Sequence, residues 1–449
     1  MLYNQAGTFT NERISMSVTV VVGLQWGDEG KGKVVDLLAQ DADIVIRSTG
    51  GNNAGHSIIN EHGKFVLHLV PAGIFNPNTW NVIERGVVIH PPSLMKEMQE
   101  LRSKKVSFDR LMISPDAHLV MPWHIAEEYA RKEEQQKYGV GVEIGTTLRG
   151  IGPAYQHKAG RTEAFTVADL ISRDQFIQKL EKIGAPILAW LKIRYPNADT
   201  LARLTLDVIR DEYLEAREYI APNIRNTRQF IRSALMSDLP ILLEGSQGTL
   251  LDPDFGTYPF VTSSGVTASA MCMYSGVLPQ YVSRVVGVAK AYITRVGEGP
   301  FPTEMAPEDG FRIRELGKEF GATTGRPRRC GWLDMALLRY ACEVNDINEK
   351  LEIAFTKMDI LGKLEHVKLG LYYENSGNHF DVRSLDSETP VYAMLRGWGD
   401  LHRIRSHDLL PRDAHAYLWE MRQHGGLCWP INYISVGPER DQTILSVGA

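Results

Sequence analysis

The residues that most constrain this chain lie at positions 23–33, where a glycine-rich turn directly follows a short β-branched run. The run spans residues 18–22 (VTVVV), and the turn reads GLQWGDEGKGK. A buried strand that enters such a turn and then a helix directs backbone N–H groups at a phosphate. The turn differs from a standard P-loop because Gly32, and not a hydroxyl residue, follows Lys31. Asp28 is then the obvious oxygen donor for Mg²⁺, and its carboxylate indicates catalysis or metal binding beside the phosphate.

Length and composition restrict the class of protein. The chain has 449 residues, 43% apolar and 23% charged, with a net charge of -5. It lacks the basic excess of nucleic-acid binders, and no apolar run approaches the ~18 residues of a membrane helix. Its four cysteines form no Cys-x-x-Cys pair, which indicates reduced thiols. Residues 1–17 do not resemble a secretory signal and are predicted to be a short extension. We therefore expect a cytoplasmic protein without nucleic-acid or membrane partners, with one domain over residues 18–449.

Short β-rich runs alternate with helix-like stretches along the chain. The runs are 18–23, 44–46, 65–69, 82–89, 241–243, 285–293, 353–355 and 367–373, and the helix-like stretches include 92–103 and 334–344. This alternation predicts an α/β fold with a large, mostly parallel central sheet, helices on both of its faces and a P-loop-NTPase-like architecture. Residues from about 170 to 237 carry an apolar residue every three or four positions and predict a helical insertion. In such sheets, ligands bind beyond the carboxyl ends of the strands.

Two further glycine-rich loops place a histidine and a glutamine after predicted strands. His56 lies in the loop 50–57 and is a candidate for proton transfer or for polarising an oxygen, because histidine titrates near neutrality. A lone loop histidine is also commonly structural. Gln247 lies in the loop 244–249 and can both donate and accept, which suits an amide-like base edge or a developing oxyanion. Capping and turn roles fit that loop equally well.

Two loops are suited to anions. The segment 144–153 offers hydroxyls, amides and an arginine, with Arg161 shortly after it, and such groups together suit a phosphate. The segment 320–329 contains three arginines within four positions: Arg326, Arg328 and Arg329. Because arginine forks bind carboxylates bidentately, this loop favours an acidic ligand such as a dicarboxylate. Ordinary turns with solvated charges are the alternative in both places.

A lysine and an aspartate follow the predicted strand 351–356. The Asp359 carboxylate can accept from the N1–H and 2-amino groups of guanine, while the stem of Lys357 covers the ring. Adenine lacks those donors. A phosphate loop with a carboxylate, a histidine, an arginine-rich loop and a guanine-type reader together indicate a nucleotide-driven ligase or phosphotransferase.

The chain resembles the adenylosuccinate synthetase family through motifs that follow one another in the family's order. These are 25–33 (QWGDEGKGK), 53–56 (NAGH), 150–155 (GIGPAY), 247–252 (QGTLLD), 256–259 (GTYP), 299–304 (GPFPTE) and 331–334 (GWLD). The resemblance runs from residue 18 almost to the C-terminus, and only about the first 17 residues lie outside it.

The resemblance implies a ligase that uses GTP and one Mg²⁺ per active site to join L-aspartate to IMP. The products are adenylosuccinate, GDP and phosphate, formed through a 6-phosphoryl-IMP intermediate in de novo AMP biosynthesis. Asp28, His56 and Gln247 would be catalytic: Asp28 removes the N1 proton of IMP, and His56 assists transfer of the γ-phosphoryl group. Asp28 and the backbone oxygen of Gly55 would hold the metal. A homodimer is expected, with Arg161 reaching IMP across the interface.

The remaining contacts implied by the resemblance fall into three sets. GTP would be bound by Gly27, Glu29, Gly30, Lys31, Gly32, Lys33, Lys357, Asp359, Ser435 and Gly437. IMP would be bound by Asn53, Thr147, Arg161, Gln247, Thr262 and Arg326. L-Aspartate would be bound by Val296, Thr323, Arg326 and Arg328.

Several positions depart from the usual family pattern: Asn52, Leu148, Gly265, Val266, Pro327 and Cys330. Most lie beside the expected nucleotide or aspartate sites. They leave open a paralogous ligase that joins aspartate to another purine monophosphate. A relative that uses a guanine nucleotide typically has Ser where this chain has Asp28, so Asp28 favours a substrate with an N1 proton and no 2-amino group. A non-catalytic nucleotide-binding regulator is the other alternative, and the presence of Asp28, Lys31 and His56 argues against it.

Overall fold

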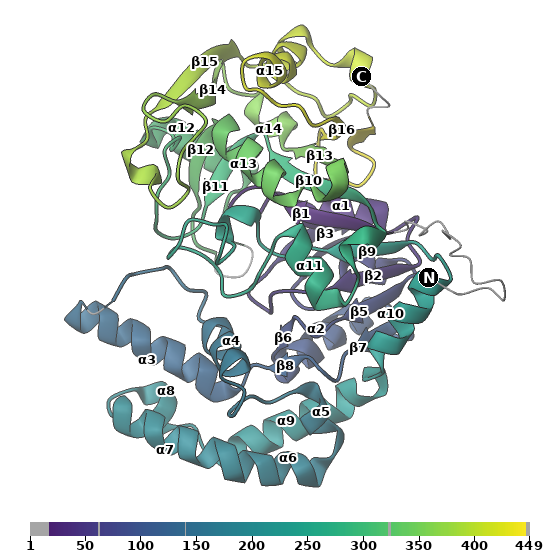
Figure 1. Ribbon diagram of the computed structural model, residues 1–449, viewed down its shortest axis with the longest axis vertical. Coiled ribbons are helices and arrows are strands. Elements are labelled where there is room, and N and C mark those ends of the chain that lie inside the picture. Colours follow the sequence, from purple (N-terminus) through teal and green to yellow (C-terminus); the bar gives the residue numbers. More distant parts are fainter. Residues whose placement is uncertain (1–17, 62, 140, 322–324, 446–449) are drawn as a thin grey trace, which may run out of the picture.

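The central element is a nine-stranded sheet with the strand order β17-β16-β13-β10-β1-β9-β2-β5-β7 (Figure 1). The computed structural model describes residues 18–61, 63–139, 141–321 and 325–445. The strands are β1 (Val18–Gly23), β2 (Ile44–Arg47), β5 (Trp80–Ile83), β7 (Leu111–Ile113), β9 (Ile241–Glu244), β10 (Val282–Lys290), β13 (Leu351–Thr356), β16 (Ile431–Ser435) and β17 (Thr443–Leu445). Every neighbouring pair is parallel except β16 and β17 at one edge. The predicted α/β fold with a mostly parallel sheet is confirmed.

The central strand β1 shows why this sheet is covered on both faces. Its β-branched side chains alternate in direction, since successive residues of a strand point to opposite faces. Val20 and Val22 join one apolar cluster with Met271 and Leu337. Val21 joins a second cluster on the other face with Val35. Near-continuous apolar strands of this kind are typical of parallel sheets buried on both faces.

Three smaller sheets complete the strand content of the described residues. One has the order β11 (Tyr292–Arg295), β12 (Arg329–Asp334), β14 (His366–Tyr373) and β15 (Pro390–Arg396). The others pair β3 (His56–Asn60) with β4 (Gly63–Leu67) and β6 (Val88–Ile89) with β8 (His118–Leu119).

Most of the predicted strands have somewhat different bounds in the structure, as three of them illustrate. The run 82–89 is not one strand, because the chain turns at 84–87, where the Val87 N–H donates to the Glu84 carbonyl. The run 285–293 is divided between β10 and β11 at Ala291. The run 65–69 ends two residues earlier than predicted, at Leu67 of β4.

The helices outside the stretch 167–236 are α1 (Lys31–Leu38), α2 (Pro91–Ser103), α3 (Pro122–Tyr138), α4 (Ile151–Gly160), α11 (Ala268–Ser275), α12 (Pro307–Gly317), α13 (Met335–Asn345), α14 (Met358–Leu361) and α15 (Arg412–Gln423). Single 3₁₀ turns are η1 (Ala72–Phe75), η3 (Ala221–Asn223), η4 (Thr249–Leu251), η5 (Pro279–Tyr281), η6 (Ile347–Glu349), η7 (Leu385–Ser387) and η8 (His407–Leu409). The predicted helices 92–103 and 334–344 correspond to α2 and α13. Asp334 precedes α13 as its N-cap, and its Oδ1 accepts from the Leu337 N–H at 3.1 Å.

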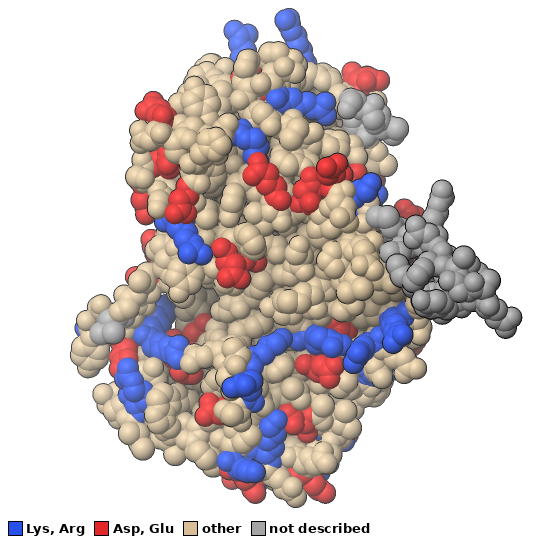
Figure 2. Space-filling model, in the orientation of Figure 1, with Lys and Arg blue, Asp and Glu red and all other residues tan. Residues whose placement is uncertain are grey.

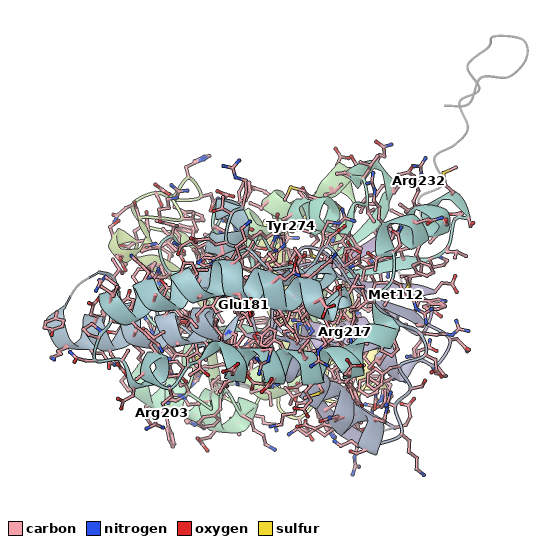
Figure 3. All side chains as sticks on the ribbon, turned by 90° about the horizontal axis from the view of Figure 1, so that it is seen from below. Met112, Glu181, Arg203, Arg217, Arg232 and Tyr274 are labelled. Atoms are coloured by element: carbon pink, nitrogen blue, oxygen red, sulfur yellow. The ribbon has the colours of Figure 1, made fainter. Side chains whose placement is uncertain are left out.

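Residues 167–236 are predominantly helical. Residues 167–220 form a helical lobe at the bottom of Figure 1, next to α3 and α4, whereas residues 227–236 lie beside β5 and β7. The whole stretch contains α5 (Val167–Ile171), α6 (Arg173–Lys179), the π turn Leu180–Gly184, α7 (Ala185–Arg194), α8 (Asp199–Ala202), α9 (Leu206–Ile220) and α10 (Thr227–Met236). Figure 3 shows this lobe from below, with Glu181 of the π turn and Arg217 of α9 on adjacent helical segments. Its interior is aromatic: Phe176 and Tyr213 stack with ring centroids 6.0 Å apart. Among the described residues, no helix is long and apolar enough to cross a membrane.

Candidate active site

Because the strands are parallel, the carboxyl ends of β1, β2, β9, β13 and β16 lie along the same side of the sheet, here called the strand-end edge. The loops that follow these strands carry most of the residues predicted from the sequence. Residues far apart along the chain therefore meet at this edge, as expected for ligand sites in open α/β sheets.

The phosphate loop between β1 and α1 is held in a left-handed turn by its own glutamate. Gly27, Asp28 and Gly30 have φ angles of 83°, 60° and 91°. The buried Glu29 carboxylate accepts from the Gly27 N–H at 2.9 Å and pairs with the Lys31 Nζ at 2.5 Å. The Lys33 N–H donates to the Gly30 carbonyl at 3.2 Å. The N–H groups before it lie in the first turn of α1, where a helix offers no carbonyl to them, so this turn can present them to an anion.

The loop that follows β13 is joined to the phosphate loop. The Thr356 Oγ1 donates to the Glu29 carbonyl at 2.6 Å. Glu29 is one of the residues predicted to bind GTP, and this prediction leaves its side chain free for another role. The structure places it under the loop, where it fixes the backbone.

His56 lies against the first turn of α1. A Cβ placed on Gly32 would be 3.0 Å from the Cβ of His56. The His56 Nδ1 is 2.5 Å from Oε1 of Glu244, whose Oε2 accepts from the Ala72 N–H at 2.7 Å. Burial lowers the pKa of His56, and the hydrogen bond to Glu244 opposes this shift. With Nδ1 held by the carboxylate, Nε2 is the ring nitrogen left for chemistry.

Sequence reasoning missed Glu244 as the partner of His56. The residue ends the strand run ILLE as its one charged member, and its side chain is fully buried. A carboxylate at the end of an otherwise apolar buried strand was the available signal. The partner could not be identified from it, because His56 lies 188 positions earlier.

Gln247 and Asn53 present unpaired polar atoms at the same edge. The Gln247 Oε1 and Nε2 and the Asn53 Oδ1 are buried without a hydrogen-bond partner among the described residues. A Cβ placed on Gly50 would be 3.2 Å from the Gln247 Oε1, so the loops after β2 and β9 meet. Buried polar atoms are nearly always paired in folded proteins, so this arrangement is complementary to a polar ligand.

The arginine-rich loop reaches the phosphate loop through Arg328. Its Nε is 2.8 Å from the Asp28 Oδ2, and its Nη1 donates to Glu319. Burial works against the charge of Arg328, but Asp28 and Glu319 outweigh it and raise its pKa. Arg326 is half-buried, and Thr323 lies outside the described residues. The proximity of Asp28 to the arginine-rich loop is thus a direct ion pair.

The residues predicted for the guanine pocket gather beside α1. The Lys33 Nζ donates to the Ser435 Oγ at 2.7 Å and to the carbonyls of Gly437 and Gln442 at 2.8 and 2.9 Å. Burial lowers the pKa of Lys33 to about 7. Lys33 thus ties α1 to the segment after β16.

Asp359, which is predicted for the same pocket, is buried, and burial raises its pKa. The Lys357 backbone is left-handed, with a φ of 62°, and its Nζ donates to the Gly317 carbonyl at 2.9 Å.

The other predicted residues border this edge from the side of α4. Cβ atoms placed on Gly145 and Gly152 would be 3.0 Å from the Gly297 Cα and 3.5 Å from the Ser263 Oγ. The loop that carries Thr147 therefore lies near the segments that carry Val296 and Thr262. Arg161 directly follows α4 as its C-cap, with a φ of 69°, and is exposed.

A metal ion would have few protein ligands here. No group of three His, Cys, Asp or Glu residues suited to a metal occurs in the described ranges. Asp28 nevertheless holds a cationic group, the Arg328 guanidinium, at 2.8 Å. One carboxylate and the Gly55 carbonyl match Mg²⁺, which binds through one or two protein oxygens and completes its shell with phosphate oxygens and water. The residues present therefore fit a nucleotide-bound Mg²⁺.

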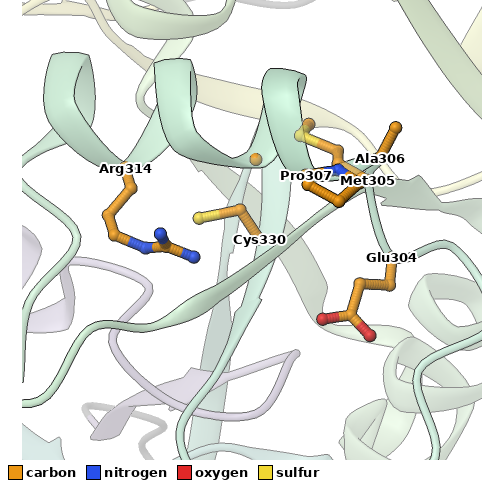
Figure 4. Close-up of a pocket in the computed structure, with 7 residues that line it drawn as sticks. Glu304, Met305, Ala306, Pro307, Arg314 and Cys330 are labelled. Carbon is orange, nitrogen blue, oxygen red and sulfur yellow. The ribbon is translucent and has the colours of Figure 1, made fainter.

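A separate cavity of about 450 Å³ lies behind the arginine-rich loop (Figure 4). It is lined by Glu304, Met305, Ala306, Pro307, Gly310, Arg314 and Cys330. The Arg314 Nε donates to the Arg328 carbonyl at 2.9 Å, so the cavity backs onto that loop. Burial raises the pKa of the Cys330 thiol to about 11, which makes it a poor nucleophile.

The site combines a phosphate loop, which suits a nucleotide, with groups that can move protons and bind anions. These groups are the carboxylate in the loop, the histidine–glutamate pair and the buried arginine. The fold and the site together define an α/β enzyme that acts with a nucleotide. The family profile described as adenylosuccinate synthetase matches residues 20–444. The chain is 45% identical over 443 residues to the adenylosuccinate synthetase of Salinibacter ruber, covering 96% of this chain and 99% of the relative. It is 43% identical to the chloroplastic adenylosuccinate synthetase 1 of Capsicum frutescens, covering 98% and 85%. The chain belongs to the adenylosuccinate synthetase family and is a ligase.

A solved structure supports the same assignment. The fully ligated adenylosuccinate synthetase from Plasmodium falciparum is similar with a TM-score of 0.86 and 34% identity, over 96% of this chain and 100% of that one. The cyanophage S-2L succinoaminodeoxyadenylate synthetase, bound to dGMP and dATP, matches with a TM-score of 0.57 and 17% identity, over 97% and 96%. At that identity the second likeness shows the fold alone.

Proposed function

We propose that this enzyme joins L-aspartate to IMP at the expense of GTP, giving adenylosuccinate, GDP and phosphate. One observation carries the proposal: amide atoms of Gln247 and Asn53, buried and without a hydrogen-bond partner in the described part of the chain, lie at the strand-end edge that also holds Asp28 and His56. A purine with a 6-oxo group and an N1–H offers the donors and acceptors that these amides lack. Family membership supports the same reaction.

In this mechanism, the Asp28 carboxylate takes the N1 proton of IMP, which makes the 6-oxygen nucleophilic. Gln247 donates to that oxygen as negative charge develops on it. The backbone N–H groups at the start of α1, together with Lys31, hold the phosphates of GTP. His56, oriented by Glu244, presents Nε2 to the transferring phosphoryl group. The 6-oxygen attacks the γ-phosphorus of GTP, and GDP leaves. The amine of aspartate then attacks C6 of the purine, and the phosphorylated oxygen leaves as phosphate.

Mg²⁺, held by Asp28 and the Gly55 carbonyl, would neutralise phosphate charge when bound. Asp359 and Lys357 would read guanine, with Ser435 and Gly437 closing that pocket. Val296, Thr323, Arg326 and Arg328 would bind aspartate, and Thr147 and Thr262 would add contacts to IMP. We also propose a cytoplasmic homodimer in which Arg161 reaches the partner's IMP; its exposed position at the end of α4 supports this role.

A substrate panel tests the reaction. The purified enzyme is mixed with GTP, Mg²⁺, aspartate and one of four monophosphates: those of inosine, deoxyinosine, guanosine and deoxyguanosine. We expect turnover with the inosine nucleotide, seen as the absorbance change of a 6-oxo purine becoming a 6-amino-substituted one. Turnover only with a guanosine nucleotide would establish the paralogous ligase. Tight nucleotide binding without turnover of any substrate would establish a regulator.

A further inference from the structure

Two hydrogen bonds between Glu319 and Arg328 close the base of the arginine-rich loop. The Arg328 N–H donates to the Glu319 carbonyl at 3.0 Å, and its Nη1 donates to the Glu319 carboxylate. The next pair inward is joined as well, since the Gly321 N–H donates to the Arg326 carbonyl at 2.8 Å. Glu319 and Arg328 therefore set where the loop begins and ends.

The Glu319 carboxylate is fixed by the two strands beneath the loop. The Tyr292 hydroxyl donates to its Oε1 at 2.6 Å, and the Lys290 Nζ lies 3.4 Å from the same oxygen. The side chains of Lys290 and Glu319 are 0% and 1% exposed. Since Lys290 ends β10 and Tyr292 begins β11, the carboxylate takes its position from the sheets and not from the loop.

The two ionic contacts of Arg328 differ in quality. Its contact with Glu319 is a hydrogen bond. Its Nε lies 2.8 Å from the Asp28 Oδ2, yet among the described residues that nitrogen has no hydrogen-bond partner of acceptable geometry. The Asp28 contact is thus a charge contact without directional alignment, whereas the Glu319 contact combines charge with a hydrogen bond.

Burying an ion network in this way is a poor means of stabilising a loop. Well-packed apolar side chains of similar size commonly do as well or better, because charges must first be stripped of water. A fixed carboxylate on one side and a poorly aligned one on the other instead suit a guanidinium that changes partners. Arginine can hold one carboxylate with one edge and offer its other nitrogens to a second.

Building on the proposed function, we propose that Glu319 is a positioning residue for ligation. It fixes the position of the Arg328 guanidinium while the other contact of that group changes. Before substrate arrives, Arg328 neutralises Asp28, and it then binds a carboxylate of the incoming aspartate. Arrival of aspartate thereby releases Asp28, and Glu319 acts on the reaction only through Arg328.

The test compares Glu319→Gln with Glu304→Gln. Glu304 pairs with the neighbouring arginine, Arg329, at 2.8 and 2.5 Å, but it lies on the surface and outside the network. We expect Glu319→Gln to raise the KM for aspartate about tenfold or more, as for loss of a charged hydrogen bond, while the KM for GTP changes less than about twofold. Glu304→Gln should leave both KM values unchanged.

Tyr292→Phe keeps the test informative if Glu319→Gln does not fold. It removes one hydrogen bond to the Glu319 carboxylate and should raise the KM for aspartate in the same selective way, by a smaller factor. A KM for aspartate that stays unchanged in the folded variants would overturn the proposal. So would an equal rise in the KM values for aspartate, IMP and GTP, because that pattern indicates general disruption of the site.

Equilibrium binding separates this proposal from the proposed reaction. Binding of aspartate, in the presence of IMP and GDP, is measured for the unmodified enzyme and for Glu319→Gln. If the enzyme ligates IMP and aspartate but aspartate binding does not depend on Glu319, only the positioning role of Glu319 is wrong. If aspartate binding weakens in Glu319→Gln but no monophosphate is turned over, only the reaction is wrong.

Discussion

The strand-end edge of the central sheet and the helical lobe at 167–220 place their charged side chains in opposite environments. At the edge, Lys290, Glu319 and Arg328 form a network whose side chains are almost fully buried. In the lobe, Arg210 pairs with Asp207 and Asp211 on the surface of α9. Basic and acidic side chains are interspersed over the outside of this lobe in Figure 2.

The difference shows where each region obtains its stability. The lobe is stabilised by its apolar and aromatic interior, and its surface ion pairs contribute little. The edge keeps desolvated charges in fixed positions, which is costly for folding and useful for binding anions. Substitutions at the edge should therefore change catalysis, while substitutions inside the lobe should change stability.

The largest effect is expected at the edge, for Asp28→Asn. The amide cannot take the N1 proton, so kcat should fall at least about 10³-fold, within the range for loss of a general base. GTP and IMP should bind with nearly unchanged affinity, measured by calorimetry. Near-normal turnover would show that Asp28 is not the base.

In the lobe, Ile209→Ala should give the matching loss in stability. Ile209 lies on α9 and is fully buried, so truncation leaves a cavity that costs about 2–5 kcal/mol. Denaturant unfolding followed by circular dichroism measures this change. The kcat of the folded fraction should stay unchanged, and a fall in kcat comparable to that of Asp28→Asn would erase the contrast between the two regions.

Asp359→Ala tests the guanine side of the edge. Loss of a carboxylate that accepts two hydrogen bonds from guanine should weaken GTP about ten- to hundredfold. Adenine lacks those two donors, so ATP should lose far less. The KM for each nucleotide is the measurement, and equal losses for GTP and ATP would contradict guanine reading by Asp359.

Lowering the pH should reduce the contribution of Glu319 to the free energy of unfolding. Burial opposes its ionisation, but Lys290 and Arg328 outweigh burial and lower its pKa from 4.5 to about 2. Because this pKa is lower in the folded state, the carboxylate stabilises the fold above about pH 4.5, and the contribution disappears as the pH falls toward 2. The difference in unfolding free energy between the unmodified protein and Glu319→Gln should thus shrink between about pH 5 and pH 3. A difference that grows with acidity would mean the sign is wrong.

The smallest effect is expected for Arg210→Ala. Its two ion pairs lie on the exposed side of α9, where solvent and salt screen them. The melting temperature should stay within experimental error at low and high salt. A clear loss of stability at low salt would show that the surface charges of the lobe matter as much as its interior.

Much of this edge could be predicted from the sequence, because its loops follow strands that carry strong local signals. The β-branched run before the phosphate loop and the strand before Asp359 both lie where predicted. The carboxylates that support the site could not be assigned in the same way. Glu244 and Glu319 act on residues brought near them by the fold, and no local pattern indicates such partners. The sequence indicates Glu29 as part of the phosphate loop, but its position beneath the loop depends on the left-handed backbone at Gly27 and Gly30.

The bond from Lys33 to Ser435 joins residues 402 positions apart. During synthesis, α1 leaves the ribosome long before the segment that receives its lysine exists. Until residues 435–442 emerge, the Lys33 ammonium of α1 lacks these hydrogen-bond acceptors and is solvated by water. Nucleotide binding should thus appear only late in translation, and nascent chains stalled before residue 435 should remain open to proteases and chaperones at the very loop that later binds phosphate.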